Sequence, residues 1–464
     1  MVSEAVRASV DRDLTLHRVP GPSYQQLLDS DRYAVPEILR ERSEWPAGEP
    51  HRIPRHRYFS QRVHDREVAG MWLKVWQMAC RADQIGQVGD SILYQVAQRQ
   101  YIVVRVDAHT VKAFPNTCLH RGRTLRTGDG RVGRLRCPYH GFAWNLDGSL
   151  ADVPTRWDFD GLDPELLRMP EARVETWGGF VFVNPDPDAA PLAEHLGEVP
   201  KHFERVPIDD WGTKVHVAKV LDCNWKAGLE AFIEAAHVIT THPQSVTAND
   251  PCNSQYDIWE NLVRIITPMG VPSVRLTRDP GEQKKMDGMM GRKSTQRSVI
   301  EVPDGVLARH MFADLHRRRM RKAVLTADYS DAEMTDLQTY WIFPNLLVLG
   351  GPRGTVMRFR PWGTDPRRCA MDVIQLGPPS PKDADTTPPT ASWVPDGQTW
   401  SEQPGLADYE LVDQDMANMI AVQRGIENAP DIPVLLSDYQ ESAIAHFHHL
   451  LYQRWLDGDG EDGS

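Results

Sequence analysis

The stretch "CPYHGFAW" at residues 137–144, together with "NTCLHRGRTL" at 116–125, decides how the first half of this chain folds. Each stretch places a cysteine two or three residues before a histidine and follows the pair with a glycine. The pairs are Cys118 with His120 and Cys137 with His140, separated by residues 121–136. Zinc sites usually begin with two closely spaced cysteines and end with paired histidines, so two mixed pairs fit zinc poorly.

The spacing instead predicts a Rieske 2Fe–2S centre, in which two thiolates hold one iron and two imidazoles hold the other. Because imidazole is neutral where thiolate is charged, such a cluster carries less negative charge and accepts an electron more readily. Gly122 and Gly141 would let each loop pass close to the inorganic sulfurs. The alternative is four unrelated buried residues, which a four-ligand spacing disfavours.

Composition sets the broad class of the chain. Its 464 residues are enough for two or three domains, and 41% hydrophobic with 25% charged residues is ordinary for a soluble globular protein. The net charge of −12 disfavours nucleic acid and anionic membranes as partners. Six scattered cysteines argue for metal binding or burial rather than disulfides. The sequence shows no apolar stretch of membrane-spanning length and no signal peptide, so a cytoplasmic location is expected.

Changes in periodicity predict three parts. Residues 1–60 are expected to form a polar, partly helical arm, 61–180 a small β domain, and 181–464 an α+β domain whose antiparallel sheet curls against a C-terminal helix. Within the last part we expect helices at 225–240, 413–426 and 437–456. The polar stretches 280–297 and 378–405 are expected to be surface loops.

The stretch "DCNWKAGLEAFIEAAHVITTHP" at 222–243 predicts a second metal site. On a regular helix Glu230, Glu234 and His237 would share one face. His242 would lie about 140° further round that helix. The next residue is a proline, however, which should end the helix near residue 240 and let both histidines meet one metal. A pair of capping histidines without a metal is the alternative.

Two histidines with one carboxylate form the facial triad of non-haem Fe(II) oxygenases, which leaves coordination positions open for dioxygen chemistry. The stretch "LVDQDMANMIAVQRG" at 411–425 offers Asp413 and Asp415 at the start of an amphipathic helix. Acidic residues in the first turn of a helix are often there for the helix dipole alone. The residues by themselves therefore leave the choice of carboxylate open.

These motifs resemble the large (α) subunit of Rieske non-haem iron oxygenases, the ring-hydroxylating oxygenase family, over about residues 65–455. The resemblance rests on the two mixed pairs, on "NWK" followed by an acidic residue three before His237, on the H-x4-H spacing and on "DQDMANM". It implies an all-β Rieske domain joined to a helix-grip catalytic domain. The ligands it implies are Cys118, His120, Cys137 and His140 for the cluster, and His237, His242 and Asp415 for one mononuclear Fe(II).

The resemblance also gives Glu234 a catalytic role. In the family an acidic residue at this place, usually aspartate, joins an iron-ligating histidine to a cluster histidine of a neighbouring subunit, here His237 and His140. This implies electron transfer between chains of a homotrimer, or of an α3β3 assembly with a small subunit. Glutamate alters the bridge geometry, and Ala231 and Ala236 stand where asparagine and tyrosine are common.

The function implied is that of a terminal oxygenase, fed by a separate reductase and possibly a ferredoxin, that hydroxylates a substrate with O2. The sequence shows no G-x-G-x-x-G motif after a strand for a nucleotide of its own. Arginines around the cluster suit an acidic electron donor, or are merely solvated. Oxidative O- or N-demethylation would use the same ligands. A Rieske electron carrier without the second iron is a further alternative.

The expected substrate cavity has an apolar wall without a charged anchor. Such a wall favours a small hydrophobic, aromatic or polycyclic substrate, and hence a role in aromatic hydrocarbon catabolism. The residues expected to form it are Phe232, Ile233, Ile239, Phe343, Leu347 and Met419.

Overall fold

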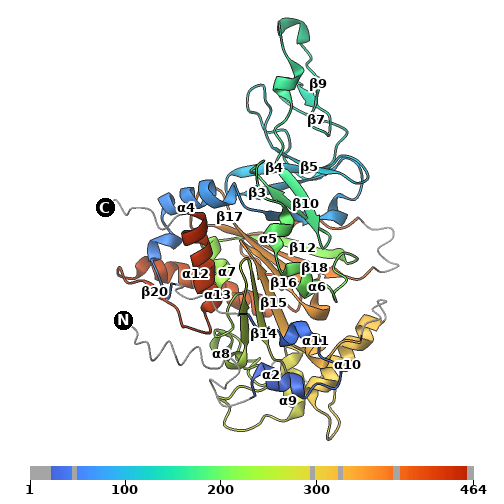
Figure 1. Cartoon of the computed structure of the whole chain (residues 1–464). Helices are drawn as coiled ribbons and strands as arrows, with labels where there is room; N and C mark the ends of the chain where they lie inside the picture. The colour runs from blue at the N-terminus through green and yellow to red at the C-terminus, as the bar shows by residue number, and fades with distance from the viewer. Residues whose placement is uncertain (1–21, 44–49, 293–297, 322–327, 380–386, 457–464) are drawn as a thin grey trace.

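The computed structural model describes residues 22–43, 50–292, 298–321, 328–379 and 387–456. Figure 1 shows a broad body of sheet and helices from which one narrow projection extends. Strands β7 (Leu135–Arg136) and β9 (Leu150–Asp152) lie in the projection. The loop that carries Cys137 and His140 directly follows β7 and therefore lies at one end of the molecule.

Short antiparallel strands build the N-terminal domain. They form three sheets, with the orders β10-β11-β2, β5-β4-β3-β6 and β7-β8-β9. The remaining bounds are β2 (Gln77–Arg81), β3 (Asp90–Val96), β4 (Arg99–Arg105), β5 (Val111–Pro115), β6 (Gly130–Arg131), β8 (Ala143–Trp144), β10 (Arg173–Trp177) and β11 (Phe180–Asn184). Because β11 starts at the expected domain boundary and pairs with β2, we propose that the division falls after Asn184.

One eight-stranded sheet organises the C-terminal domain, in the order β13-β14-β15-β16-β17-β18-β12-β19. Its strands are β12 (Gly212–Leu221), β13 (Gln255–Ile258), β14 (Leu262–Thr267), β15 (Leu337–Ile342), β16 (Leu346–Leu349), β17 (Thr355–Pro361), β18 (Cys369–Gly377) and β19 (Ser392–Trp393). Side chains alternate between the two faces, so that Tyr340 and Trp341 belong to different hydrophobic cores. Both faces of this sheet are therefore buried.

Helices cover the two faces. They are α5 (Leu192–Leu196), α6 (Val199–Phe203), α7 (Trp225–Glu230), α8 (Val238–Thr241), α9 (Glu282–Met289), α10 (Ala308–Arg321), α11 (Asp331–Thr335), α12 (Glu410–Asn428) and α13 (Ser442–His449), which continues into the π-helical turn η9 (Leu450–Trp455). On the Trp341 side the core includes Trp225 of α7, Met416 of α12 and Phe447 of α13. Figure 1 shows these three helices grouped together beside the sheet.

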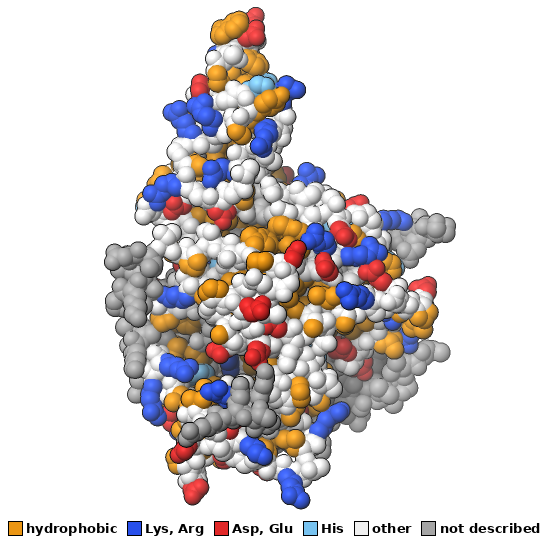
Figure 2. All heavy atoms as spheres, turned by 180° about the vertical axis from the view of Figure 1, so that it is seen from behind, with side chains coloured by type: hydrophobic (Ala, Val, Ile, Leu, Met, Phe, Trp, Pro, Cys, Tyr) orange, Lys and Arg blue, Asp and Glu red, His pale blue; other side chains and the backbone are white. Residues whose placement is uncertain are grey.

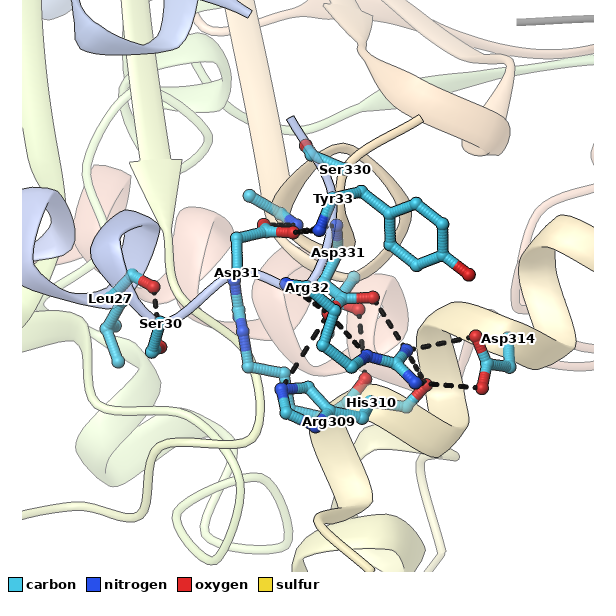
Figure 3. Close-up of polar contacts among 12 residues, drawn as sticks. Leu27, Ser30, Asp31, Arg32, Tyr33, Arg309, His310, Asp314, Ser330 and Asp331 are labelled. Atoms are coloured by element: carbon cyan, nitrogen blue, oxygen red, sulfur yellow. Dashed lines mark hydrogen bonds and ion pairs between the residues drawn. The ribbon is translucent and has the colours of Figure 1, made fainter. Parts of the chain in front are cut away.

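The N-terminal arm is fastened to the catalytic domain by ion pairs, which Figure 3 shows in close-up. The arm contains α2 (Tyr24–Asp29) and α3 (Glu37–Arg40), followed by η1 (Arg55–Tyr58), α4 (Gln61–Glu67) and η2 (Val68–Trp72). Arg32 forms ion pairs with Asp331 at 2.8 Å and with Asp314 at 2.9 Å. The Asp31 carboxylate accepts hydrogen bonds from the first backbone N–H groups of α11. These contacts clamp the arm onto α10 and α11. A two-stranded sheet of β1 (Arg52–Ile53) and β20 (Val434–Leu435) adds a second link.

The expected helix at 225–240 is wrong. Helix α7 stops at Glu230, and α8 begins only at Val238. The intervening backbone N–H groups find other acceptors, because Ala235 donates to the Tyr256 hydroxyl and His237 to the carboxylate of Glu234. The shared face expected for Glu230 with Glu234 and His237 is therefore absent.

The two expected surface loops are only partly irregular. Helix α9 lies within 280–297, and β19 lies within 378–405, where it pairs in parallel with β12. The segments 293–297 and 380–386 lie outside the described residues.

Candidate metal centres

The two cysteine–histidine loops have the same hydrogen-bond pattern. The N–H of Gly122 donates to the carbonyl of Cys118, at 2.9 Å, and that of Gly141 to the carbonyl of Cys137, at 3.1 Å. Both glycines adopt positive φ, +74° and +82°, which favours glycine over other residues. A Cβ on Gly141 would also lie 2.7 Å from Cγ of Pro154. Local turn geometry is therefore sufficient to require glycine at 141.

The loops bring four candidate cluster ligands to the projection. Cys118 and Cys137 are buried and form no disulfide, and the rings of His120 and His140 have centroids 4.8 Å apart. Nδ1 of His120 is buried and has no hydrogen-bond partner among the described residues. Burial raises the pKa of the Cys118 thiol. Two paired thiols beside an unpartnered imidazole nitrogen fit a Rieske cluster.

The second centre is assembled from two segments of chain, because His237 and His242 flank α8 and Asp415 lies on α12. One ligand atom from each of His237, His242 and Asp415 can be chosen so that all lie within 4.8 Å of one another. Oδ1 of Asp415 is 2.8 Å from Nε2 of His242 and 3.4 Å from Nε2 of His237. It is buried, yet it accepts no well-aligned hydrogen bond among the described residues. The donor set fits a divalent metal bound by two imidazoles and one carboxylate.

The far side of each histidine ring is held by a polar partner. Nδ1 of His242 donates to Oε1 of Gln414 at 2.8 Å, and Gln244 donates to the same oxygen at 2.9 Å. Nδ1 of His237 contacts the carboxylate of Glu234. With both Nδ1 atoms occupied, each Nε2 is directed toward Asp415, as a metal ligand requires. The sequence analysis did not identify Gln244 or Gln414, because no motif or residue spacing indicates that they orient His242.

Charge in the second centre is held by an imidazole–carboxylate pair. Burial lowers the pKa of His237, but the nearby carboxylates of Asp415 and Glu234 outweigh it and raise the pKa to about 10. Burial likewise raises the pKa of Asp415, and the two histidines outweigh it and lower that pKa. A metal cation would take the place of the proton, because ligating histidines must be neutral.

Asp413 lies on the same helix but has a different set of contacts. Its carboxylate accepts hydrogen bonds from the backbone N–H of Trp400 at 2.7 Å and from the hydroxyl of Ser401 at 2.6 Å. It therefore fastens the preceding loop to α12. Of the two acidic residues, Asp415 is the one that faces the histidines.

The residues expected to line a substrate cavity are distributed between the core and the metal-carrying segment. Ile233, Phe343, Leu347 and Met419 are almost fully buried in the core on the Trp341 side. Phe232 and Ile239 are half-buried, and the ring of Phe232 lies 5.4 Å from that of Phe359. Their role in binding substrate stays a prediction.

The fold and the two centres define a protein with an N-terminal iron–sulfur domain and a C-terminal domain that holds a mononuclear metal. Residues 75–162 match the Rieske [2Fe-2S] domain, and residues 201–458 match the catalytic domain of the ring hydroxylating alpha subunit. The chain therefore belongs to the ring-hydroxylating alpha subunit family. Its cofactors are one Rieske 2Fe–2S cluster and one mononuclear iron. No helix within the described ranges is long and apolar enough to cross a membrane.

Several proteins are similar over part of the chain. The carnitine monooxygenase oxygenase subunit of Escherichia coli K12 is 28% identical over 41% of this chain and 52% of its own length. Choline monooxygenase of Spinacia oleracea is 24% identical over 61% of this chain and 63% of its own length. The biphenyl 2,3-dioxygenase alpha subunit of Rhodococcus jostii is 32% identical over 42% and 44%. The chain thus matches less than two thirds of each relative.

Solved structures show the same fold over more of the chain. A quaternary ammonium Rieske monooxygenase in complex with L-carnitine superposes with a TM-score of 0.62 at 18% identity, over 87% of this chain and 95% of that one. Naphthalene 1,2-dioxygenase with bound phenanthrene superposes with a TM-score of 0.60 at 20% identity, over 86% and 91%. At these identities the similarity shows the fold.

Proposed function

We propose that the chain is the terminal oxygenase of a multicomponent system that receives electrons from a separate reductase, with or without a ferredoxin. Cys118, His120, Cys137 and His140 would hold the cluster, and His237, His242 and Asp415 the iron. The observation that carries this proposal is the convergence of these last three residues, with both histidines already turned to present Nε2.

The residues of the chain have separable roles in such a reaction. When bound, the cluster supplies single electrons and the iron activates O2. Glu234 and Gln414 hold the two imidazoles in the ligating tautomer. The single carboxylate of Asp415 leaves other coordination positions open.

Electron transfer within one chain would have a long path. Figure 1 places β7 and β9, next to the cluster loops, at the far end of the molecule from α8, which lies between the two ligand histidines. His140 is exposed, and the side chains of Glu234 and His237 keep 11% and 25% of their surface exposed. These features support a ring in which His140 of one subunit approaches Glu234 of the next. We propose a homotrimer, with or without a small subunit.

The surface of the projection suits an acidic electron donor. Arg121, Arg123, Arg131, Arg134 and Arg136 are exposed around the cluster loops, and Figure 2 shows lysine and arginine side chains gathered on this part of the molecule. A negatively charged donor would be steered to that surface, and its association would weaken with salt.

The relatives shift the preferred substrate class away from aromatic hydrocarbons. Carnitine and choline, named for two of them, are trimethylammonium compounds, and a third relative is a glycine betaine monooxygenase subunit. We infer monooxygenation next to the nitrogen of a methylated amine, which is the chemistry of demethylation. The Phe232–Phe359 pair could supply an aromatic face for such a cation. Aromatic hydroxylation is the second candidate, favoured by the apolar core residues and the biphenyl dioxygenase relative.

Iron content and product analysis test this function together. The purified protein should contain about three irons per chain, two in the cluster and one mononuclear. With a surrogate reductase and O2, trimethylammonium compounds should yield demethylated or hydroxylated products, whereas biphenyl and naphthalene should yield much less. About two irons per chain and no product from either panel would instead indicate an electron carrier.

Replacing a cluster histidine should change the reduction potential. His120→Cys should retain an iron–sulfur centre whose potential falls by about 200 mV or more, because all-cysteine clusters lie near −400 mV. Spectroelectrochemical titration of the variant and the wild-type protein measures this shift. An unchanged potential would remove His120 from the cluster.

A further inference from the structure

A buried polar network that the proposed chemistry does not use lies at the C-terminal end of α7. The carboxylate of Glu230 accepts a hydrogen bond from the Tyr58 hydroxyl, whose oxygen is 3.0 and 3.1 Å from the two carboxylate oxygens. Nε2 of His448 is 2.9 Å from Oε1 of Glu230 and 3.1 Å from the Tyr58 oxygen. Tyr58 and His448 are fully buried. Three distant segments of the chain, η1, α7 and α13, therefore meet at one carboxylate.

The proton positions in this network follow from Arg57. Its guanidinium, which can only donate, lies 3.3 Å from Nδ1 of His448. His448 must therefore carry its proton on Nε2 and donate it to Glu230. Burial, together with the charges of Arg57 and Lys226, lowers the pKa of His448 well below its usual value. The ring is thus neutral and fixed in one tautomer.

Glu230 stands where the chain leaves the helix for the metal centre. Its carbonyl accepts the N–H of Ile233 at 3.2 Å, and the next residues lead to Glu234 and His237 without helical structure. The side chain of Glu230 is fixed by Tyr58 and His448, and its carbonyl is bound by the N–H of Ile233, so both parts of the residue are held in place. The metal-carrying segment begins at this residue.

We propose that Glu230 is a positioning residue whose carboxylate, held by Tyr58 and His448, fixes the point at which residues 231–237 leave α7 and so sets the geometry of the mononuclear metal centre. This inference rests on the proposed metal centre, although not on any particular substrate.

The network also makes that geometry sensitive to pH. Burial raises the pKa of Glu230 to about 8, partly offset by Tyr58 and by the charge of Lys226, while Glu441 raises it further. A protonated Glu230 adds a third donor to a network in which Tyr58 and His448 already donate to it, and Arg57 keeps the His448 proton on Nε2. Protonation would therefore weaken the contacts that hold the end of α7.

Iron release and an electron paramagnetic resonance (EPR) signal test the proposal without an activity assay. At pH 9, where Glu230 is ionised, ferrozine should remove the mononuclear iron from Glu230→Gln about 10-fold faster than from the wild-type protein, the scale expected for partners behind metal ligands, while the cluster absorption is unchanged. Tyr58→Phe should show a similar change. The double variant should be little worse than either single one, because the two side chains act through one contact.

The nitrosyl complex of the bound Fe(II) gives the pH readout, since the iron keeps its histidine ligands from titrating. In the wild-type protein its EPR line shape should change with a midpoint near pH 8. In Glu230→Gln one line shape should persist from pH 7 to 9.

Glu67→Gln is the matched control. Glu67 is also a buried carboxylate against α7, but it contacts Lys226 at 2.6 Å and Trp225 at 2.9 Å, at the opposite end of the helix. This variant should lower the melting temperature yet release iron within about twofold of the wild-type rate. Equal iron release from Glu230→Gln and the wild-type protein would overturn the proposal, as would equally fast release from the Glu67 variant. Failure to oxygenate any substrate would leave both readouts intact and would count only against the proposed function.

Discussion

Asp415→Ala should abolish product formation, with a loss of at least about 100-fold, while the Rieske absorption of the protein stays intact. The variant removes the only carboxylate that lies against both His237 and His242 among the described residues. Two imidazoles alone hold Fe(II) weakly, because the facial triad needs its anionic ligand. Iron analysis should therefore show the cluster iron and little of the third. Product assays with a surrogate reductase and absorption spectra measure both effects.

Asp413→Ala is the control for that prediction. This carboxylate binds the backbone of Trp400 and the hydroxyl of Ser401 rather than the histidines. Its loss should loosen the loop before α12 and cost about 1 kcal/mol of stability, as expected when partly buried hydrogen-bond donors lose their acceptor. Mononuclear iron should remain bound. If Asp413→Ala lost the iron and Asp415→Ala kept it, the assignment of the carboxylate ligand would be wrong by two residues.

Glu234→Gln should slow electron delivery between the two centres by about 10- to 100-fold without emptying either one, the range found when partners of metal ligands are replaced. The amide oxygen can still accept the backbone N–H groups of Ala236 and His237, so the local turn should persist. The amide lacks the charge that holds the Nδ1 proton of His237 and that would hold a proton of His140 from a neighbouring subunit. Stopped-flow mixing of the reduced protein with oxygenated substrate measures reoxidation of the cluster.

Glu234→Asp separates charge from turn geometry in this experiment. It keeps the carboxylate at a shorter reach and should recover much of the reoxidation rate that the glutamine variant loses. The competing explanation is that Glu234 only closes the turn at residues 234–237, in which case both variants would reoxidise at the wild-type rate with normal product yield. That outcome would also weaken the case for a ring of subunits.

The sequence was most informative where ligands lie close together along the chain. The two cysteine–histidine pairs each occupy one tight loop, and a loop that short nearly fixes the relative positions of its own side chains. The proline after His242 likewise predicted that the helix would end nearby, and α8 does end at Thr241. The strand and helix texture of the C-terminal part predicted an α+β domain, and an eight-stranded sheet with helices is found there.

The interruption of the helix after Glu230 had no local signal. The stretch from Ala231 to Ala236 contains good helix formers, and intrinsic propensity favours a continuous helix there. The hydroxyl that accepts the N–H of Ala235 belongs to Tyr256, which lies on strand β13. Tertiary hydrogen bonds of this kind outweigh propensities of a few tenths of a kcal/mol per residue.

By itself, then, the sequence determined the two-domain fold class, the residue types of the cluster loops and the pair of histidines, because short-range spacing and periodicity carry that information. The family resemblance already favoured Asp415 over Asp413, but only the tertiary structure placed Asp415 against the histidines, showed that Gln414 orients His242, and showed that Glu230 is tied to Tyr58 and His448. Each of these depends on segments more than 150 residues apart being packed together. Contacts at that separation depend on how the whole core packs. Neither segment contains a periodic pattern of residues that would predict them.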